Sequence, residues 1–193
     1  MRRSREAAAR TREEIVEAAA ALFRARGIDA VSIADVMGEL GLTVGGFYKH
    51  FKSKDALVAE AIELASQRTS PRSGSAEDAV RGYLSLAHRA QPEQGCPVAA
   101  LCSEAGRQPA STRRAFTQAL EGLLAQVAAL FPHSRQEQLH TVAALVGGLV
   151  LARATGDEKL AKELLDAVAE ELLARRPGKT RSRSTRAVAR GGK

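Results

Sequence analysis

The stretch SIADVMGELGLTVGGFYKHFKSK, residues 32–54, decides the fold of this chain. Ser32, followed three residues later by Asp35, has the pattern of a capping box with Asp in place of the usual Glu, which predicts a helix start. Gly41 can adopt the left-handed conformation that ends a helix, and Thr43 is a residue type favoured at the start of the next one. The stretch therefore predicts two short helices joined by a tight glycine turn and followed by an aromatic and basic cluster.

Helical periodicity continues on both sides of this stretch. Residues 11–26 carry apolar side chains on one face, and Gly27 follows where a helix would stop. Ser53 is a candidate cap for a helix that runs to about residue 67, and the Ser-, Pro- and Gly-containing segment 69–75 is the clearest linker. Later helices are predicted at about 76–90, 97–106, 111–131, 134–154 and 157–175. No period of two indicates a strand, so we expect an all-α fold of about nine helices.

The linker divides the chain into a smaller head and a larger body. We expect five parts: a basic N-terminal arm (1–10), a helix-turn-helix domain (11–52), a linking helix (53–68), a helical body (76–175) and a basic tail (176–193). The tail has too few apolar residues to fold and is expected to be disordered. Residues 175–193 contain eight Lys or Arg and no acid, so they account for the net charge of +7. The overall basicity is therefore weak evidence about the head.

Composition and hydropathy place the protein in a broad class. The N-terminus does not resemble a secretory signal, and the longest apolar stretch, Val142 to Ala152, is about half of what a membrane-spanning helix needs. The two cysteines, Cys96 and Cys102, are too few for a disulfide scaffold, which fits a reducing compartment. We therefore expect a soluble, cytoplasmic protein without a membrane partner.

The second predicted helix of the opening stretch, residues 43–50, has the side chains of a DNA-contacting element. Phe47 lies three residues after Val44 and is the better core anchor, which leaves Tyr48 and Lys49 to face phosphates. Thr43 offers a hydroxyl group and Val44 offers methyl groups, which suit contact with thymine edges in a DNA groove. The residues expected to contact DNA are Ser32, Thr43, Val44, Gly45, Gly46, Tyr48, Lys49, His50 and Lys54.

Two glycines give this helix an unusual character. Gly45 and Gly46 each cost the helix about 1 kcal/mol relative to Ala. We infer a recognition helix that tightens on DNA and relies partly on groove shape. Of the flanking aromatic residues, Phe51 is expected to pack in the head, while His50 is open between a core hydrogen bond and a phosphate contact.

These residues resemble the TetR/AcrR family of bacterial transcriptional regulators. The match covers about residues 10–60 and rests on REEIVEAA at 12–19, ALF at 21–23, Gly27, YKHF at 48–51 and KDAL at 54–57. The resemblance implies a three-helix DNA-binding head, a linking fourth helix, and a body, residues 76–175, that binds a small molecule and dimerises through its last two helices. Two departures from the family pattern, Met37-Gly38 and Gly45-Gly46, affect the packing of the head and the operator sequence.

In the body, the segment Gly95-Cys96-Pro97 is the strongest candidate for a chemically reactive site. Proline favours the first helical position, so Cys96 is expected at the cap of the helix 97–106, where free amides and the helix dipole stabilise a thiolate. The segment also resembles a branch of the family in which some members sense electrophiles or oxidants through a body cysteine. The alternative is a small buried residue at a helix start. Cys102 is about 9 Å away along the helix, too far for a disulfide.

The ligand pocket and the dimer interface are predicted from apolar faces. We expect the pocket to lie between the fifth and eighth helices and to suit a mainly apolar ligand, and its candidate lining residues are Tyr83, Leu86, Cys96, Leu101, Phe116 and Leu120. For each of these residues taken singly, ordinary core packing is the favoured alternative. The expected dimer interface consists of Leu139, Val142, Val146 and Leu149 with Leu160, Leu164, Val168 and Leu172. Alternatively, one of these two apolar helix faces could pack in the core of a monomer.

The sequence thus predicts a non-enzymatic, homodimeric, sequence-specific DNA-binding repressor that a small-molecule inducer or cysteine modification releases from its operator. No cofactor or metal is expected, because His88 and the cysteines lack ligand spacing. Two rivals belong to other classes. An enzyme would use Cys96 as nucleophile and His88 as base, but nothing in the sequence places them together. A ligand-independent architectural protein would bind any duplex through the basic tail.

Overall fold

The computed structural model describes residues 2–69, 75–131 and 134–174, and these ranges are helical without any strand. The elements are α1 (Arg2–Arg26), α2 (Ile33–Glu39), α3 (Val44–Phe47), α4 (Lys54–Arg68), α5 (Ala76–Tyr83), α6 (Leu86–Ala90), the 3₁₀ helix η1 (Pro92–Gln94), α7 (Pro97–Ala105), α8 (Ala110–Leu130), α9 (Arg135–Ala154) and α10 (Glu158–Ala174). The all-α prediction is confirmed. The tail expected at 176–193 and most of the expected linker lie outside the described residues.

Two segments differ from the expected pattern. α1 begins at Arg2, so the expected arm is helical from its second residue, and its Arg, Glu and Ala residues are strong helix formers. The helix expected at 76–90 is divided into α5 and α6. The division falls at Leu84 and Ser85, and the Ser85 hydroxyl caps α6 by accepting the His88 amide at 3.1 Å. Local capping therefore outweighs the continuous apolar period.

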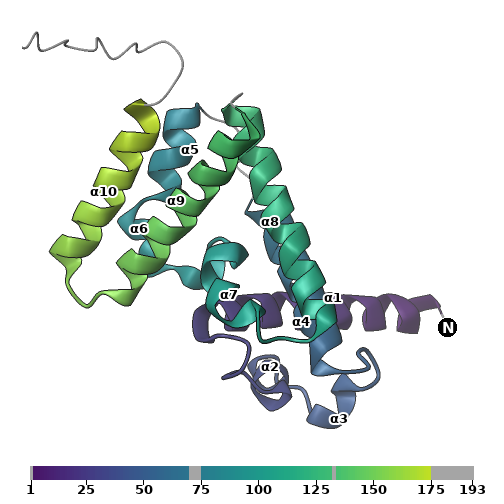
Figure 1. Cartoon of the computed structure of the whole chain (residues 1–193). Coiled ribbons are helices and arrows are strands. Elements are labelled where there is room, and N and C mark those ends of the chain that lie inside the picture. The colour runs from purple at the N-terminus through teal and green to yellow at the C-terminus, as the bar shows by residue number, and fades with distance from the viewer. Residues whose placement is uncertain (1, 70–74, 132–133, 175–193) are drawn as a thin grey trace, which may run out of the picture.

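The helices form a head and a body that share α4. Figure 1 shows α2 and α3 below the long α1, with α8 rising beside α4 and the antiparallel pair α9 and α10 on the far side of the body. α1 is tied to α4 by ion pairs of Arg12 with Glu60, at 2.6 Å, and of Arg68 with Glu17. Among the described helices, none combines the length and the apolar character needed to cross a membrane.

One connected cluster of buried side chains extends through the whole molecule. It includes Phe23 and Phe47 in the head, Leu57 on α4, and Leu149 and Leu165 on the last two helices. α4 packs against α1 on the head side and against α8 on the body side. The head is therefore fixed to the body by a continuous core. A displacement of the body helices that pack on α4 would move the head as well.

Candidate DNA-binding head and ligand cavity

The helix-turn-helix begins with the expected capping box. The Ser32 hydroxyl accepts the Asp35 amide at 3.1 Å, and the Asp35 carboxylate accepts the Ser32 amide at 2.7 Å. The hydrogen bonds from Ser32 lower the pKa of Asp35 below its ordinary value. Gly27 (φ 89°) and Gly41 (φ 65°) both take the left-handed conformation at the ends of α1 and α2, as expected. These four residues define the ends of α1 and α2 and thereby the path of the chain into α3.

α3 is a short helix anchored by one buried aromatic ring. It ends at Phe47, three residues earlier than expected, and continues as a turn in which the His50 amide donates to the Phe47 carbonyl at 2.9 Å. Phe47 is fully buried (0% exposed) and its ring stacks on Phe51 with centroids 5.4 Å apart, which confirms both packing predictions. Tyr48, the next residue, is 62% exposed. The helix thus presents one side to the core and the other to solvent.

The nine residues expected to contact DNA fall into three groups. The exposed ones are Thr43, Val44, Gly45, Tyr48 and Lys49, and the half-buried ones are Gly46 and His50. Ser32 is exposed and Lys54 half-buried, and both are engaged inside the head: the Ser32 hydroxyl donates to the Asp35 carboxylate, and the Lys54 ammonium donates to the Ile28 carbonyl at 2.6 Å. Lys54 therefore ties α4 to the loop between α1 and α2, a role that the isolated motif did not reveal.

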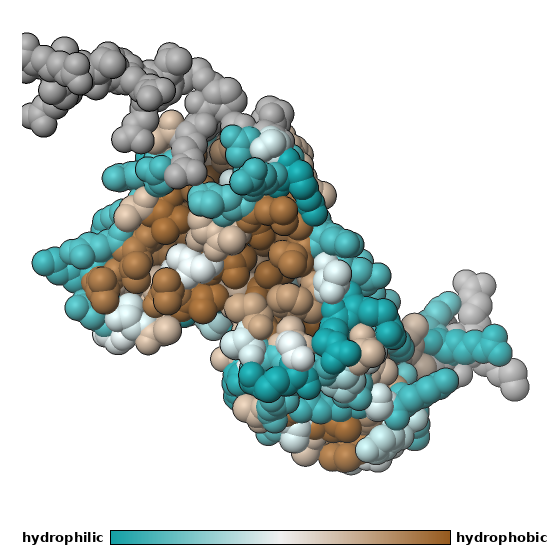
Figure 2. Space-filling model, viewed as in Figure 1, coloured by the Kyte–Doolittle hydropathy of each residue, from teal (hydrophilic) through white to brown (hydrophobic). Residues whose placement is uncertain are grey.

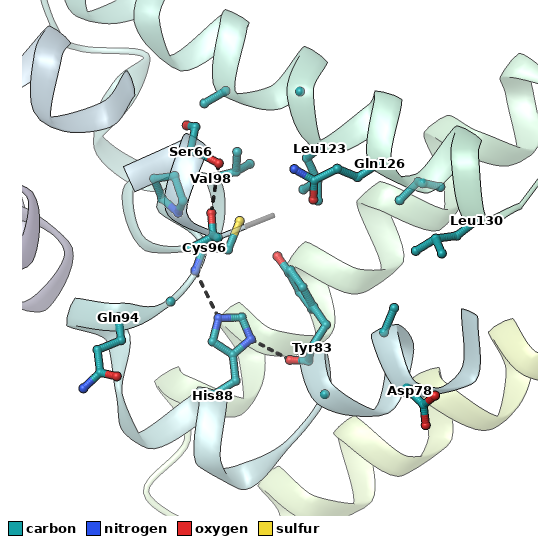
Figure 3. A pocket seen from close by; sticks show the side chains of 18 residues that line it. Ser66, Asp78, Tyr83, His88, Gln94, Cys96, Val98, Leu123, Gln126 and Leu130 are labelled. Carbon is teal, nitrogen blue, oxygen red and sulfur yellow. Dashed lines mark hydrogen bonds between the residues drawn. The ribbon is translucent and has the colours of Figure 1, made fainter. Parts of the chain in front are cut away.

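The body contains a cavity of about 450 Å³ between α4, α5, α7 and α8, a size typical of small-molecule sites. Tyr83 and Cys96 line it as expected, together with Val98, Leu123, Val127 and Leu130. Its polar lining comes from Ser66, Thr69, Asp78, His88, Gln94 and Gln126. Figure 3 shows Leu123, Gln126 and Leu130 on one wall and Tyr83, His88 and Cys96 on the opposite one.

Four predicted pocket residues are not among those that line this cavity. Leu101 is buried in the core, and Leu86, Phe116 and Leu120 are partly buried against it. On an amphipathic helix, core-facing and cavity-facing positions carry the same apolar residue types, so the period alone does not separate them. Sequence reasoning missed the polar lining residues because they come from five elements, α4, α5, α6, η1 and α8, that only the fold brings together.

Three side chains from neighbouring elements meet at the cavity wall. Cys96 is the cap residue of α7, as expected, and its amide donates to Nε2 of His88 at 3.1 Å. Nδ1 of the same ring lies 2.7 Å from the Tyr83 carbonyl, which accepts its proton. This arrangement fixes a neutral tautomer, and burial lowers the pKa of His88 further. The Arg153 guanidinium of α9 donates to the backbone carbonyl of His88 at 2.7 Å and so holds this residue from the other side.

The structure corrects one expectation about this group. His88 does lie beside Cys96, although nothing in the sequence places it there, because the break between α5 and α6 turns the ring back toward α7. Both ring nitrogens are engaged with backbone groups, so the imidazole supports the loop between α5 and α7 and holds no lone pair toward the Cys96 thiol. The geometry favours a structural histidine over the general base that the enzyme alternative requires.

The Tyr83 hydroxyl is the unusual group of the cavity. Burial, with the neighbouring Cys96 thiol, raises the pKa of Tyr83 far above its ordinary value, so the phenol stays protonated. The hydroxyl is buried, and among the described residues its polar neighbour is the Cys96 thiol, with which it forms no hydrogen bond of ordinary geometry. Figure 3 shows it directed toward the Cys96 sulfur at the cavity wall. A buried hydroxyl without a partner carries a desolvation cost, which a ligand with an acceptor atom would relieve.

The outer surface of α9 and α10 is apolar. Figure 2 shows a hydrophobic area over these helices on the face turned toward the viewer. Leu139, Leu151 and Leu160 are exposed, and Val146, Val150, Leu164 and Val168 are half-buried. Three residues predicted in the dimer interface, Val142, Leu149 and Leu172, are instead buried inside the single chain, because they form the contact between α9, α10 and the rest of the body. Gly148 meets Val168 within the chain, whereas Gly147 faces open space.

The geometry defines a helix-turn-helix protein with a ligand-sized cavity, and comparison with known proteins agrees. Residues 15–61 match the family model described as bacterial regulatory proteins, tetR family. An uncharacterized HTH-type transcriptional regulator of Mycobacterium tuberculosis is 28% identical over 76% of this chain and 86% of its own. The repressor KstR2 of Mycolicibacterium smegmatis is 37% identical over 26% of this chain and 25% of its own. The head of the chain, residues 15–61, thus has the DNA-binding domain of the tetR family of bacterial regulatory proteins.

The fold outside the matched head is also shared. The crystal structure of a TetR-family regulator from Cytophaga hutchinsonii superposes with a TM-score of 0.72 at 19% identity, covering 89% of this chain and 98% of that one. At this identity the likeness extends to the fold alone. The protein is therefore a DNA-binding transcriptional regulator whose body has the family's helical architecture.

Proposed function

We propose that the protein is a homodimeric repressor that leaves its operator when an uncharged small molecule fills the cavity of the body or when Cys96 is modified. The observation that carries the proposal is the position of Cys96, which lies in the cavity wall and occupies the N-cap position of α7. An occupant of the cavity therefore acts on the start of a helix. The name of the similar KstR2 protein designates a repressor, which supports repression over activation.

The lining of the cavity indicates the class of ligand. Apolar side chains of α8 form one wall, and the acidic lining residue, Asp78, uses its carboxylate to cap α5 through Ser75. The Tyr83 hydroxyl remains available as a donor. We infer a mainly apolar, neutral ligand with one acceptor oxygen or nitrogen that meets Tyr83, since a charged ligand would lose its hydration without a counter-charge.

On the DNA side, the proposed contacts are the exposed residues of α3 and its following turn. Thr43 and Val44 face the bases, and Tyr48 and Lys49 face phosphates. Gly45 is exposed, and its missing side chain permits the backbone to approach the groove closely. Ser32 and His50 are secondary candidates, and Lys54 supports the head from behind.

The proposed dimer interface is the apolar α9–α10 face, namely Leu139, Val146, Val150, Leu151, Leu160, Leu164 and the open Gly147. Exposed apolar area of this kind on two packed helices marks an interface, and a two-fold axis would bury it as a four-helix arrangement. Two heads placed by such an axis suit half-sites about one helical turn apart.

Fluorescence anisotropy tests the proposal. The purified protein is titrated against DNA flanking its own gene and against scrambled DNA at the same salt. A sequence-specific repressor is expected to show a ratio of about a thousandfold or more. N-ethylmaleimide, applied to a Cys102→Ser variant so that only Cys96 reacts, is expected to lower operator affinity. Equal binding to both duplexes would support the ligand-independent architectural alternative, and loss of all binding on deleting residues 176–193 would establish it.

A further inference from the structure

The loop that joins α1 to α2 is held by a side chain from the body. The Glu104 carboxylate, near the end of α7, accepts the amides of Ile28 and Asp29 at 2.8 and 3.0 Å. The Gln108 side chain, which is buried, donates to the Asp29 carboxylate at 2.8 Å. We call these three hydrogen bonds the loop contact. They are bonds to backbone and side chain of the head from residues more than seventy positions away along the chain.

The loop contact leaves no space for a side chain on the preceding residue. Gly27 has φ 89°, and a Cβ placed there would lie 2.2 Å from Oε1 of Glu104. Gly41 offers a comparison, because its φ is 65° and a Cβ there would meet nothing within 4 Å. Glycine is therefore required at position 27 for two reasons, its left-handed backbone and the close approach of α7. At position 41 the left-handed backbone alone favours glycine.

α7 connects this loop to the cavity. Cys96, Pro97 and Val98 at its start line the cavity, and Glu104 lies at its other end. Eight residues of helix span about 12 Å, so a rigid α7 transfers a displacement at the cavity to Glu104, whose carboxylate contacts the loop. The loop leads within three residues from Asp29 to Ser32, the cap of α2. A shift of the loop thus reaches the start of the helix-turn-helix directly.

We propose that Glu104 is a positioning residue that couples the cavity to the DNA-binding head through α7 and the loop contact. This inference rests on the proposed function, because it describes how a change at Cys96 reaches α2 and α3. The coupling runs through the oxygen acceptor of Glu104, since both amides of the loop donate to the same carboxylate oxygen. Removal of that acceptor takes away this route from the cavity to the head, while the packing of α4 against α1 and α8 remains.

The experiment uses full-length Cys102→Ser protein and N-ethylmaleimide as the probe. The Cys96 sulfur adds to the maleimide double bond, and its proton ends on the adjacent carbon, so no other reactant is needed. Alkylation is expected to lower operator affinity about tenfold or more in the parent, within the usual range of coupling between sites. In Glu104→Ala, with the same degree of alkylation by mass spectrometry, the fall should be under about threefold. Should the buried thiol resist alkylation, Cys96→Met supplies the added bulk.

Two variants separate coupling from general damage. Glu104→Gln keeps an acceptor oxygen and is expected to keep the full fall in affinity. Ser103→Ala alters the exposed neighbour on the same helix and should behave as the parent. Glu104→Ala with an undiminished fall on alkylation would overturn the proposal. Glu104→Gln behaving like Glu104→Ala would also overturn it, because charge and not the acceptor would then carry the effect.

Hydrogen exchange distinguishes failure of the coupling from failure of the proposed function. In the unmodified parent the Ile28 and Asp29 amides are expected to be protected, and alkylation of Cys96 should raise their exchange. Unchanged exchange on alkylation would refute the coupling. Raised exchange without loss of operator affinity would refute the proposed response to cysteine modification and leave the coupling established.

Discussion

Phe47 and Tyr48 are adjacent in the sequence and have opposite surroundings in the head. Phe47 has no exposed surface and stacks on Phe51, whereas Tyr48 is 62% exposed. Consecutive side chains at the end of a helix turn project about 100° apart, so one ring anchors the element and the other remains available to a partner. An exposed aromatic ring lowers solubility, and the proposed contact with DNA gives a reason for its exposure.

Substitution separates the two roles. Tyr48→Phe removes a hydroxyl that has no packing role, so we expect the free energy of unfolding to change by less than about 0.5 kcal/mol. Affinity for operator and scrambled DNA should fall by a similar factor, as for a lost phosphate contact. Phe47→Ala, the control, is expected to cost about 3–5 kcal/mol in urea unfolding. A loss confined to operator DNA would instead identify Tyr48 as a base-reading residue.

Among the elements, α3 is the least stable by its own sequence. It has four residues, and two of them are Gly45 and Gly46. A Cβ at Gly45 would meet nothing within 4 Å, whereas one at Gly46 would approach Met37 and Thr43. The absence of a side chain at Gly45 is therefore not required by the packing of the free protein, and we attribute it to the proposed close approach of the backbone to DNA.

Gly45→Ala tests this reason. Since the new methyl group enters open space, we expect the variant to be more stable by up to about 1 kcal/mol in thermal or urea unfolding. Operator affinity, measured by anisotropy, should fall about tenfold or more, because the methyl group separates the backbone from the groove. Gly156→Ala, an equally open position between α9 and α10, should change no DNA affinity. Unchanged operator binding by the Gly45 variant would contradict close approach.

The segment from α5 to α7 is held by the His88 ring, and its stability should depend on pH. Burial lowers the pKa of His88, so the unfolded chain takes up a proton near pH 6.5 that the folded protein does not bind. The free energy of unfolding is therefore expected to fall as pH decreases through about 6.5. His88→Gln should be less stable at pH 7 and lose this dependence, measured by urea unfolding between pH 5 and 8. His140→Gln, an exposed position, should retain it.

Individual elements differ in how far the sequence could predict them. The capping box at Ser32, the stop at Gly41 and the cap position of Cys96 follow from local rules and are confirmed. The contact of His88 with the Cys96 amide could not be predicted, because the break at Leu84 and Ser85 and the path of η1 together place the ring. Ser85 as a cap and Pro92 at the start of η1 are local signals, but they do not determine the direction in which the chain continues after them.

The cavity illustrates the same limit for packing. Leu101 and Leu123 are apolar residues at helical spacing, yet Leu101 is core and Leu123 lines the cavity. The difference depends on how far the axes of α7 and α8 lie from α4 and α5, which is a property of the assembled body. Glu104 was also not singled out, since a lone acid on a helix is ordinarily a solvated side chain.

At the scale of the whole molecule, the apolar α9–α10 face predicts the oligomeric state. Leu160→Lys would bury an unpaired charge in the proposed interface, at a cost of about 3 kcal/mol or more, so the dimer dissociation constant should rise over a hundredfold. Analytical ultracentrifugation measures this shift. Glu163→Lys places the same side chain on the charged side of α10 and should leave the dimer intact. A Leu160→Lys protein that stays dimeric would place the interface elsewhere.

The sharing of α4 by head and body has a consequence for protein engineering. A chimaera that joins this head to another regulator's body at residues 52 and 53 would discard α4, with Glu60 as the partner of Arg12 and Leu57 and Ile62 from the core under α1. A junction after residue 69 keeps those contacts but carries the α8-facing side of α4 into a foreign body. Exchanging operator specificity in this protein therefore calls for replacing side chains on α3 within the native scaffold, not for grafting a module.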